Sequence, residues 1–349
     1  MRELRARVNA YFEETKKRPR DCPAMYFKTA TLVSVLVATY LLLLLGVVTT
    51  WWLVVPLTVL MGLMFAAVGF NVQHDGAHKA YSDHQWVNRL MALSMDLMGG
   101  SSYLWDIKHN SIHHTYTNIN GHDDDIDVSF LGRLSPDQPR YKFHRLQFLY
   151  LWFLYGFLMV KWQLFDDFYQ VAVGRIGHHK IARPRGKDLA IFIGGKAFFL
   201  SMVFVLPMAL HGFWCVLGIY LLAAFVEGVV TSIVFQLAHC VEEAEFPLPT
   251  INEAGLEQMD NAWAVHQVQT TVNFARRNRV LCWLLGGLNF QIEHHLFHKI
   301  CHVHYPALSK VVEQTCRDFG IKYREHRTFV GALASHARFL FAMGMPKSA

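Results

Sequence analysis

The chain has 349 residues, of which 53% are hydrophobic, and its mean hydropathy is +0.20. This composition is too apolar for an ordinary soluble domain, and the apolar residues are concentrated in long runs, so we expect an integral membrane protein. The net charge of +6 comes without a nucleic-acid-binding motif, so we assign it to loops at a membrane surface and expect no nucleic-acid partner.

Residues 1–24 form a basic arm ahead of the first apolar run. Seven Lys or Arg side chains and four acidic ones occur up to Asp21. By the positive-inside rule, such an arm stays in the cytoplasm. Charged residues occupy the place where a signal peptide has its apolar segment, so we do not interpret the arm as a signal peptide.

The first apolar run covers residues 25–70, and its only charged side chain is Lys28. At about 1.5 Å per helical residue the run would be roughly 68 Å long, about twice the thickness of a bilayer core of about 30 Å. The run therefore predicts two spans, at about residues 27–48 and 51–72, joined by a tight turn near residues 46–52.

The second apolar run covers residues 189–238 and carries only Lys196 and Glu227 as full charges. It predicts two more spans, at about residues 189–208 and 213–236, broken near residues 207–212.

Two hairpins return the chain to the side it left, so the rest of the protein should lie on the cytoplasmic face. We expect residues 79–188 and 239–349 to form a helical cap there. Apolar segments at residues 146–160 and 280–290 are short for a span and are predicted to be interfacial helices. The tail, residues 306–344, mixes charged and apolar side chains at helical spacing.

The predicted fold is therefore an all-α integral membrane protein, with four transmembrane helices in two hairpins under a cytoplasmic helical cap. After the basic arm, residues 25–349 should form a single membrane domain. The expected location is multi-pass in a bacterial inner membrane.

Three short histidine clusters lie at or near the ends of apolar stretches. They are HDGAH (His74 and His78), HNSIHH (His109, His113 and His114) and QIEHH (His294 and His295). Histidines four residues apart on a helix face the same way. The second hairpin should deliver His239 to the same membrane surface as an eighth candidate. Together these side chains predict a multidentate metal site.

Imidazole-rich ligation suits zinc, copper, iron or nickel. Eight histidines exceed the three or four ligands of one zinc ion, so two metal ions are the economical interpretation. Soluble di-iron bundles bind metal through carboxylates and Glu-x-x-His pairs. This sequence contains no such pair, so the predicted site is dominated by histidine.

The triple pattern resembles the membrane fatty acid desaturase superfamily, whose signature is three histidine boxes. LNFQIEHHLF (residues 288–297) is similar to the third box of the acyl desaturases in which glutamine opens that box, and KHNSIHHTYTNINGHDDDID (residues 108–127) resembles their second box and its sequel. The likeness covers roughly residues 71–305. The tail is also similar to bacterial linoleoyl-CoA desaturase-like proteins, and the glutamine favours the front-end desaturases, which act between an existing double bond and the carboxyl end.

The resemblance implies an oxidoreductase that acts on paired donors. A di-iron centre would use O2 as co-substrate, reduce it to water, and insert a C=C double bond into a long acyl chain linked to CoA, a carrier or a lipid. The eight iron ligands would be His74, His78, His109, His113, His114, His239, His294 and His295. Gln291 stands where other branches have histidine, and an amide is a weaker ligand than imidazole, so it should bind through water or support the site.

Other side chains are candidates for contacts with the ligand histidines from outside. In the acidic run, Asp123, Asp124, Asp125 and Asp127 are candidates for orienting ligand histidines; a solvated acidic loop or a docking surface is the alternative. His298 replaces the proline usual after HHLF and, with His302 and His304, forms a local surplus of histidines. These three are either cap residues or partners of the ligands.

Four residues ahead of the third box are candidates for lining an acyl channel, with a purely structural role as the alternative. They are Trp263, Gln267, Thr271 and Asn273.

The electrons should come from a separate protein. Many relatives of the glutamine type carry a fused N-terminal haem domain with an HPGG motif, and the first 25 residues here hold no such domain. The six cysteines include no CxxC pair, and no GxGxxG flavin fingerprint is present. We expect a ferredoxin or a cytochrome b-type haem protein, with its reductase, as donor, and a long-chain acyl substrate and membrane lipid as the other partners.

The sequence also allows three alternatives to desaturation to be compared with it. A hydroxylase, ketolase or acetylenase could use the same di-iron scaffold, and the sequence separates these reactions poorly. A zinc-dependent membrane hydrolase needs a water-activating glutamate as in HExxH, which is missing. A metal transporter would need polar ligands within the spans, whereas these histidines lie at their ends.

Overall fold

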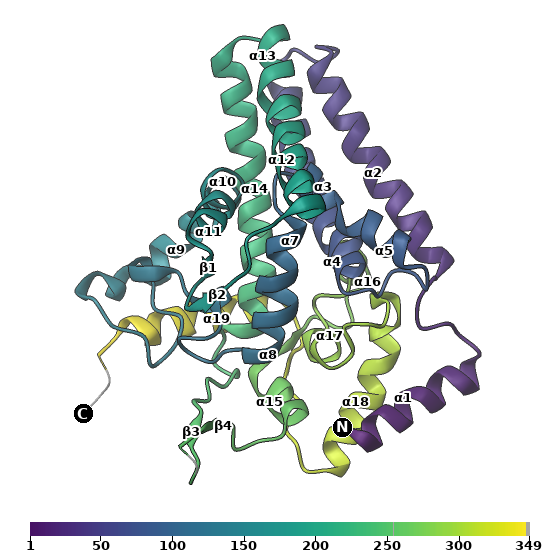
Figure 1. Ribbon diagram of the computed structural model, residues 1–349, viewed down its shortest axis with the longest axis vertical. Coiled ribbons are helices and arrows are strands. Elements are labelled where there is room, and N and C mark those ends of the chain that lie inside the picture. Colours follow the sequence, from purple (N-terminus) through teal and green to yellow (C-terminus); the bar gives the residue numbers. More distant parts are fainter. Residues whose placement is uncertain (254, 347–349) are drawn as a thin grey trace.

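The computed structural model describes residues 1–253 and 255–346, and it is mostly helical. Within these residues, four helices are long and apolar enough to cross a membrane: Pro23–Leu44, Trp51–Ala77, Gly186–Leu210 and Phe213–His239. The prediction of four spans is confirmed at this level, with ends shifted by a few residues. They stand together in the upper half of Figure 1.

Two of the four long helices contain a π-helical turn. The second consists of α3 (Trp51–Val68), the π-turn η1 (Gly69–Gln73) and α4 (His74–Ala77); the third consists of α12 (Gly186–Leu200), the π-turn η7 (Ser201–Val205) and α13 (Leu206–Leu210). The first is α2 (Pro23–Leu44), and the fourth is α14 (Phe213–His239). α2 begins with Pro23, whose fixed φ suits the first helical position.

The four helices form two hairpins whose tips meet. α2 and α3 are joined by residues 45–50, and α13 and α14 by His211 and Gly212. His211 Nε2 lies 2.7 Å from the carbonyl oxygen of Leu44, which fastens one tip to the other. Because both hairpins turn at this end (top of Figure 1), the chain after α4 and after α14 lies at the opposite end.

The segment predicted as one interfacial helix over residues 146–160 is instead broken. α9 (Gln147–Tyr155) ends before α10 (Leu158–Lys161), which continues through η6 (Trp162–Asp166) and α11 (Asp167–Val173); the two arms meet at 66°. The bend lies against α14, where a Cβ on Gly228 would stand 2.7 Å from the carbonyl oxygen of Tyr155. The backbones approach too closely for any side chain there.

We expect Gly228→Ala to destabilise the protein by about 1–3 kcal/mol, because the new methyl group would overlap backbone atoms that cannot rotate away. Gly218→Ala is the matched control on α14, since its Cβ would meet nothing within 4 Å. The control should be neutral or gain up to about 1 kcal/mol of helix propensity. Thermal unfolding of both variants in detergent checks the difference, and equal midpoints would contradict the close packing.

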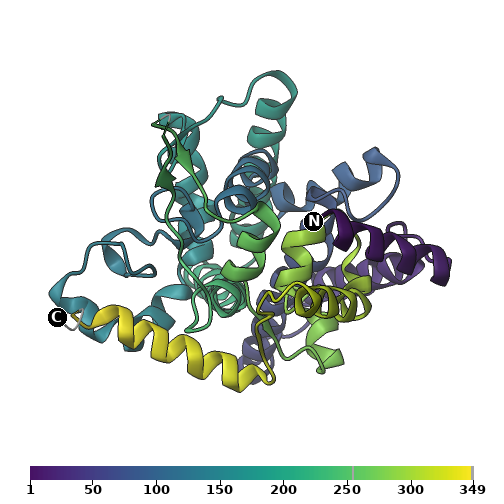
Figure 2. The same cartoon turned by 90° about the horizontal axis from the view of Figure 1, so that it is seen from below.

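The end opposite the hairpin tips carries the shorter helices. They are α1 (Arg2–Thr15), α5 (Gln85–Ala92), α6 (Ser94–Leu97), α7 (Ser102–Trp105), η2 (Asp106–His113), α8 (His114–Tyr116), η3 (Asp124–Ile126), η4 (Ser129–Leu131), η5 (Lys142–Leu146), α15 (Trp263–Thr270), α16 (Arg279–Leu284), α17 (Gln291–Phe297), η8 (His302–His304), α18 (Tyr305–Asp318) and α19 (Phe329–Gly344). Figure 2 views this end from below, with α19 along one edge.

Two predictions for this end need correction. The helix expected over residues 280–290 ends at Leu284, because Gly286 and Gly287 adopt φ of 60° and 69°, which a right-handed helix cannot continue. The tail is helical as predicted, but residues 319–328 separate α18 from α19.

Three small sheets interrupt the predicted all-α fold. β1 (Arg175–Ile176) pairs with β2 (His179–Lys180), and β3 (Thr250–Ile251) with β4 (Glu257–Gln258), as short hairpins. β5 (Asn273–Phe274) pairs in parallel with β6 (Glu325–His326). This last pair ties the tail to the segment ahead of α17.

Candidate metal centre

The three histidine boxes and His239 lie together at one place and come from five elements, namely α4, η2, α8, α14 and α17. His74 opens α4 directly after the π-turn η1, and His109 and His113 lie in the π-helix η2. His294 and His295 lie on α17, and His239 is the last residue of α14. π-helical turns are rare and often occur at functional sites, so the two π-segments mark the same region as the histidines.

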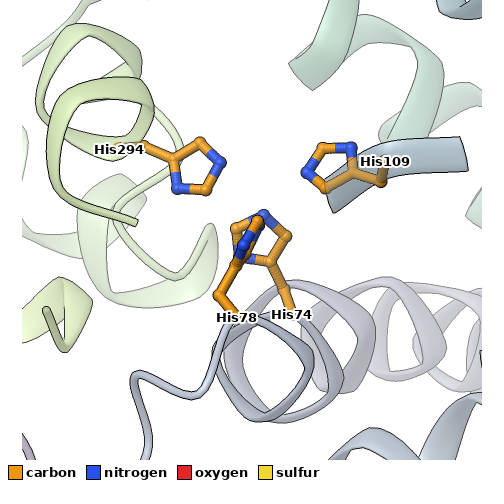
Figure 3. Close-up of side chains that lie close together, drawn as sticks. All are labelled: His74, His78, His109 and His294. Carbon is orange, nitrogen blue, oxygen red and sulfur yellow. The ribbon is translucent and has the colours of Figure 1, made fainter. Parts of the chain in front are cut away.

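Four of the histidines form what we call the first histidine group. It consists of His74, His78, His109 and His294. One ring nitrogen from each lies within 4.8 Å of the others. Figure 3 shows these four rings turned toward a common space from three separate segments.

The second histidine group lies beside the first. It consists of His113, His239 and His295, whose ring nitrogens are also within 4.8 Å of one another. His114 forms a third set with His294 and His295 and therefore stands between the two groups. Two adjoining sets of imidazoles match the prediction of two metal ions better than one shared ion, since one ion rarely takes more than four protein ligands in such sites.

The ring nitrogens of all eight histidines test whether metal fits the site. Both nitrogens of His74, His78, His114 and His239, and Nε2 of His109, His113, His294 and His295, are buried without a hydrogen-bond partner among the described residues. Leaving one such group unpaired costs about 1–3 kcal/mol. Metal coordination would account for so many buried, unpaired ring nitrogens in one place.

Burial also keeps most of these rings in the form that binds metal. Desolvation holds the pKa of His78, His114, His294 and His295 well below its usual value and lowers the pKa of His109 to about 3. A neutral imidazole has a free lone pair, so coordination needs no loss of a proton near neutral pH.

His113 and His295 are each oriented by a buried neighbour. His113 Nδ1 lies 3.0 Å from a carboxylate oxygen of Asp123; burial favours the neutral ring, but the Asp123 charge and hydrogen bond raise the pKa of His113 overall. His295 Nδ1 donates to Gln267 Oε1 at 2.7 Å. In both rings this leaves Nε2 to face the centre, the usual arrangement of metal-bound histidine.

The acidic run separates into two faces. Asp125 lies 3.8 Å from His109 Nδ1 and 3.7 Å from His113 Nδ1, so it faces the histidines together with Asp123. Asp124 pairs with Lys108 at 3.1 Å, and the same lysine also lies 3.2 Å from Asp125. Asp127 accepts a hydrogen bond from the backbone of Ser129 at an exposed turn. Of the four acids in this run, Asp123 and Asp125 lie against histidines of the two groups, whereas Asp124 and Asp127 have other partners.

Three of the four channel candidates make hydrogen bonds that support the boxes. Gln267 holds His295, and the hydroxyl of Thr271 donates to the carbonyl oxygen of Gln267. Asn273 donates to Glu293 at 2.8 Å and accepts from the backbone of Ile292 at 2.9 Å, which fixes the start of α17. All three candidates are fully buried, so these polar atoms are used within the protein.

Trp263 is the exception among the channel candidates. It is 39% exposed, and its indole Nε1–H donates to the carbonyl oxygen of His114 at 3.3 Å.

Gln291 and His298 lie on either side of the third box. Gln291 is the buried first residue of α17, one helical turn before His294, and its amide makes no hydrogen bond to another described residue. The His298 ring lies 5.2 Å from the His78 ring and 5.1 Å from the His114 ring. Burial lowers the pKa of His298 to about 4, so this surplus histidine stands neutral at the edge of the groups.

We expect Gln267→Leu to weaken metal binding in the second histidine group about 10–100-fold, the usual cost of removing a partner of a ligand histidine. The leucine cannot accept the proton of His295 Nδ1, so the ring loses its fixed orientation. Gln267→Glu keeps an acceptor and should retain more metal. Metal content after a chelator challenge measures both, and unchanged retention in Gln267→Leu would contradict the role.

Comparison with known proteins agrees with this site. The sequence matches the family described as fatty acid desaturase over residues 49–327. It is 40% identical to the sn-1 linoleoyl-lipid 6-desaturase of Arthrospira platensis over 99% of this chain and 92% of that protein. It is also 40% identical to the enzyme of the same name from Synechocystis sp. (98% and 95%), and 35% identical to the acyl-lipid (8-3)-desaturase of Physcomitrium patens (98% and 71%). The chain therefore belongs to the fatty acid desaturase family and is a fatty acyl desaturase.

Proposed function

We propose that this desaturase acts on a lipid-linked acyl chain, with O2 as co-substrate and two iron ions as its cofactor. The lipid carrier is supported by the full-length relatives named as acyl-lipid and linoleoyl-lipid desaturases. Their names also support a substrate that already holds a double bond, with the new one nearer the carboxyl end. The observation that carries the iron proposal is the pair of adjoining histidine groups, whose buried nitrogens lack other partners.

The reaction converts two adjacent methylenes and O2, with two electrons and two protons, into a double bond and two water molecules. Bound iron would supply the O2 chemistry, since no side-chain base can break a methylene C–H bond. The first histidine group would hold one ion and the second group the other, with His114 at their shared edge. Asp123 and Gln267 would keep His113 and His295 in the tautomer that presents Nε2.

In the membrane, residues 25–349 would act as one domain, with the histidine groups on the cytoplasmic side. The basic arm ahead of α2 supports this orientation through the positive-inside rule. The electron donor would be a separate protein that approaches the same face.

Expression of the full chain in a bacterial host that lacks polyunsaturated lipids, fed with linoleate, tests the proposal. Mass spectrometry of the lipids should show acyl chains two hydrogens lighter, with the new double bond on the carboxyl side. The purified protein should contain about two irons. A product one oxygen heavier would indicate hydroxylation instead, and protein that holds zinc alone would contradict the iron proposal.

A further inference from the structure

The lone charge of the first span, Lys28, has two buried partners that belong to neither histidine group. Lys28, Asp75 and His302 are only 3%, 2% and 2% exposed. They come from α2, α4 and η8, which are far apart in the sequence. Burying a charged side chain without a close partner is costly, so each of these three side chains should be paired with another polar group.

The hydrogen bonds among the three side chains have one consistent direction. Lys28 Nζ lies 2.9 Å from His302 Nε2, and His302 Nδ1 lies 2.9 Å from Asp75 Oδ2. A lysine nitrogen here acts as a donor, so Nε2 accepts and the ring proton sits on Nδ1, which donates to the carboxylate. The backbone N–H of His302 donates to the same oxygen at 3.2 Å.

Asp75, at the other end of this chain of contacts, lies beside His74, a proposed metal ligand. Asp75 directly follows His74, and its second oxygen, Oδ1, lies 3.8 Å from His74 Nδ1, beside that nitrogen but beyond hydrogen-bond distance. His74 belongs to the first histidine group. Metal-bound histidines commonly present their second nitrogen to a carboxylate, which sets the ring orientation and strengthens the ligand.

A separate metal site at this place is a competing interpretation. Asp75, Cys301 and His302 offer ligand atoms within 4.8 Å of one another. However, both nitrogens of His302 are already engaged, one by Lys28 and one by Asp75. The neighbouring lysine would also repel a cation. The geometry therefore favours a hydrogen-bonded chain over a third metal.

We infer that Lys28, His302 and Asp75 form a hydrogen-bonded chain that positions His74 and so secures the metal ion of the first histidine group. The inference rests on the proposed function, because it concerns the metal of that site. All three are positioning residues that act through His74. The chain also connects the first span to the first box and to the segment after the third box, so it couples the position of α2 to the geometry of the first group.

The test replaces His302 in the full-length protein and locates the remaining metal. His302→Leu removes both hydrogen bonds, whereas His302→Gln keeps one donor and one acceptor. After a chelator challenge, we expect wild type to keep both irons and His302→Leu to lose the iron of the first group, with affinity there reduced about 10–100-fold. Anomalous scattering at the iron edge should show the second group still filled. His302→Gln should restore part of the loss.

His336 provides a matched control. It is also fully buried and also holds two hydrogen bonds, at 2.9 Å to Tyr155 and 2.7 Å to the carbonyl oxygen of Cys240, but it lies outside both histidine groups. His336→Leu should lower thermal stability and keep both irons. Lys28→Met, which breaks the far end of the chain, should resemble His302→Leu and covers the case in which that variant does not fold.

Retention of both irons by folded His302→Leu and Lys28→Met would overturn the inference and leave the proposed function intact. Equal loss of both irons in His302→Leu would also overturn it, because the effect would then be general unfolding of the site. Wild-type protein that takes up no iron from iron-rich medium would overturn the proposed function itself, and this inference with it.

Discussion

Replacing any one of His78, His113, His114, His294 or His295 with alanine should abolish desaturation while the protein remains in the membrane. Each ring belongs to a group of buried imidazoles whose nitrogens lie within 4.8 Å of one another, so its loss removes one ligand from that group. We expect activity to fall by more than roughly a hundredfold, beyond the 10–100-fold typical of residues that only orient a ligand. Product analysis by mass spectrometry and iron per chain measure the effect.

The two groups predict different metal losses in these variants. His78→Ala should empty the first histidine group and His113→Ala the second, each leaving about one iron. His294→Ala should disturb both, because His294 belongs to the first group and also contacts the set around His114. His178→Ala, at an exposed position on the β1–β2 hairpin, is the control and should keep full activity. Wild-type turnover in two or more of the box variants would mean that the boxes are not the metal site.

The spans could be predicted because their signal is local. A helix that faces lipid must be apolar along most of its length, so two long apolar runs with few charges are enough to place four helices. The bend after α9 could not be predicted, because it depends on contact with Gly228, more than seventy residues along the chain. The early end of α16 is indicated locally by Gly286 and Gly287, which adopt positive φ. The apolar pattern of residues 280–290 alone predicts a longer helix.

The histidines proposed as ligands could also be found locally, since their spacing within each box is visible in the sequence. Their division into two groups could not. His109 and His113 are four residues apart and lie on the same face of η2, with their rings stacked 5.2 Å apart, yet His109 joins the first histidine group and His113 the second. The group that each ring joins depends on histidines brought up by α4, α14 and α17, and the spacing within one box does not reveal them.

The residues that contact the proposed ligands and their neighbours come from distant parts of the chain. The sequence alone therefore suggests other roles for them. Gln267 reaches His295 across 28 residues, and His302 reaches Asp75 across 227. From the sequence, Gln267 was a channel candidate and His302 part of a local surplus of histidines. Polar residues close to a box are candidates from the sequence alone, but only the fold shows which ring each one contacts.

Purified protein given O2 and an acyl-lipid substrate should be inert until a ferredoxin or cytochrome b-type donor and its reductase are added. Reduction of O2 to two water molecules takes four electrons, and the new double bond supplies two of them. The other two must arrive one at a time from outside the substrate. The 349 residues contain no haem motif, no GxGxxG fingerprint and no CxxC pair, so they offer no carrier of their own.

Sustained desaturation should require both the donor and its reductase. NAD(P)H alone should give no product, and the donor without its reductase should give at most a single turnover. The complete mixture should give sustained desaturation, and His113→Ala in the same mixture should give none, which excludes a contaminating desaturase. Sustained turnover with NAD(P)H alone, in protein free of flavin and haem by absorption spectrum, would contradict the prediction. It would mean that electrons reach the histidine groups by a route that the described residues do not reveal.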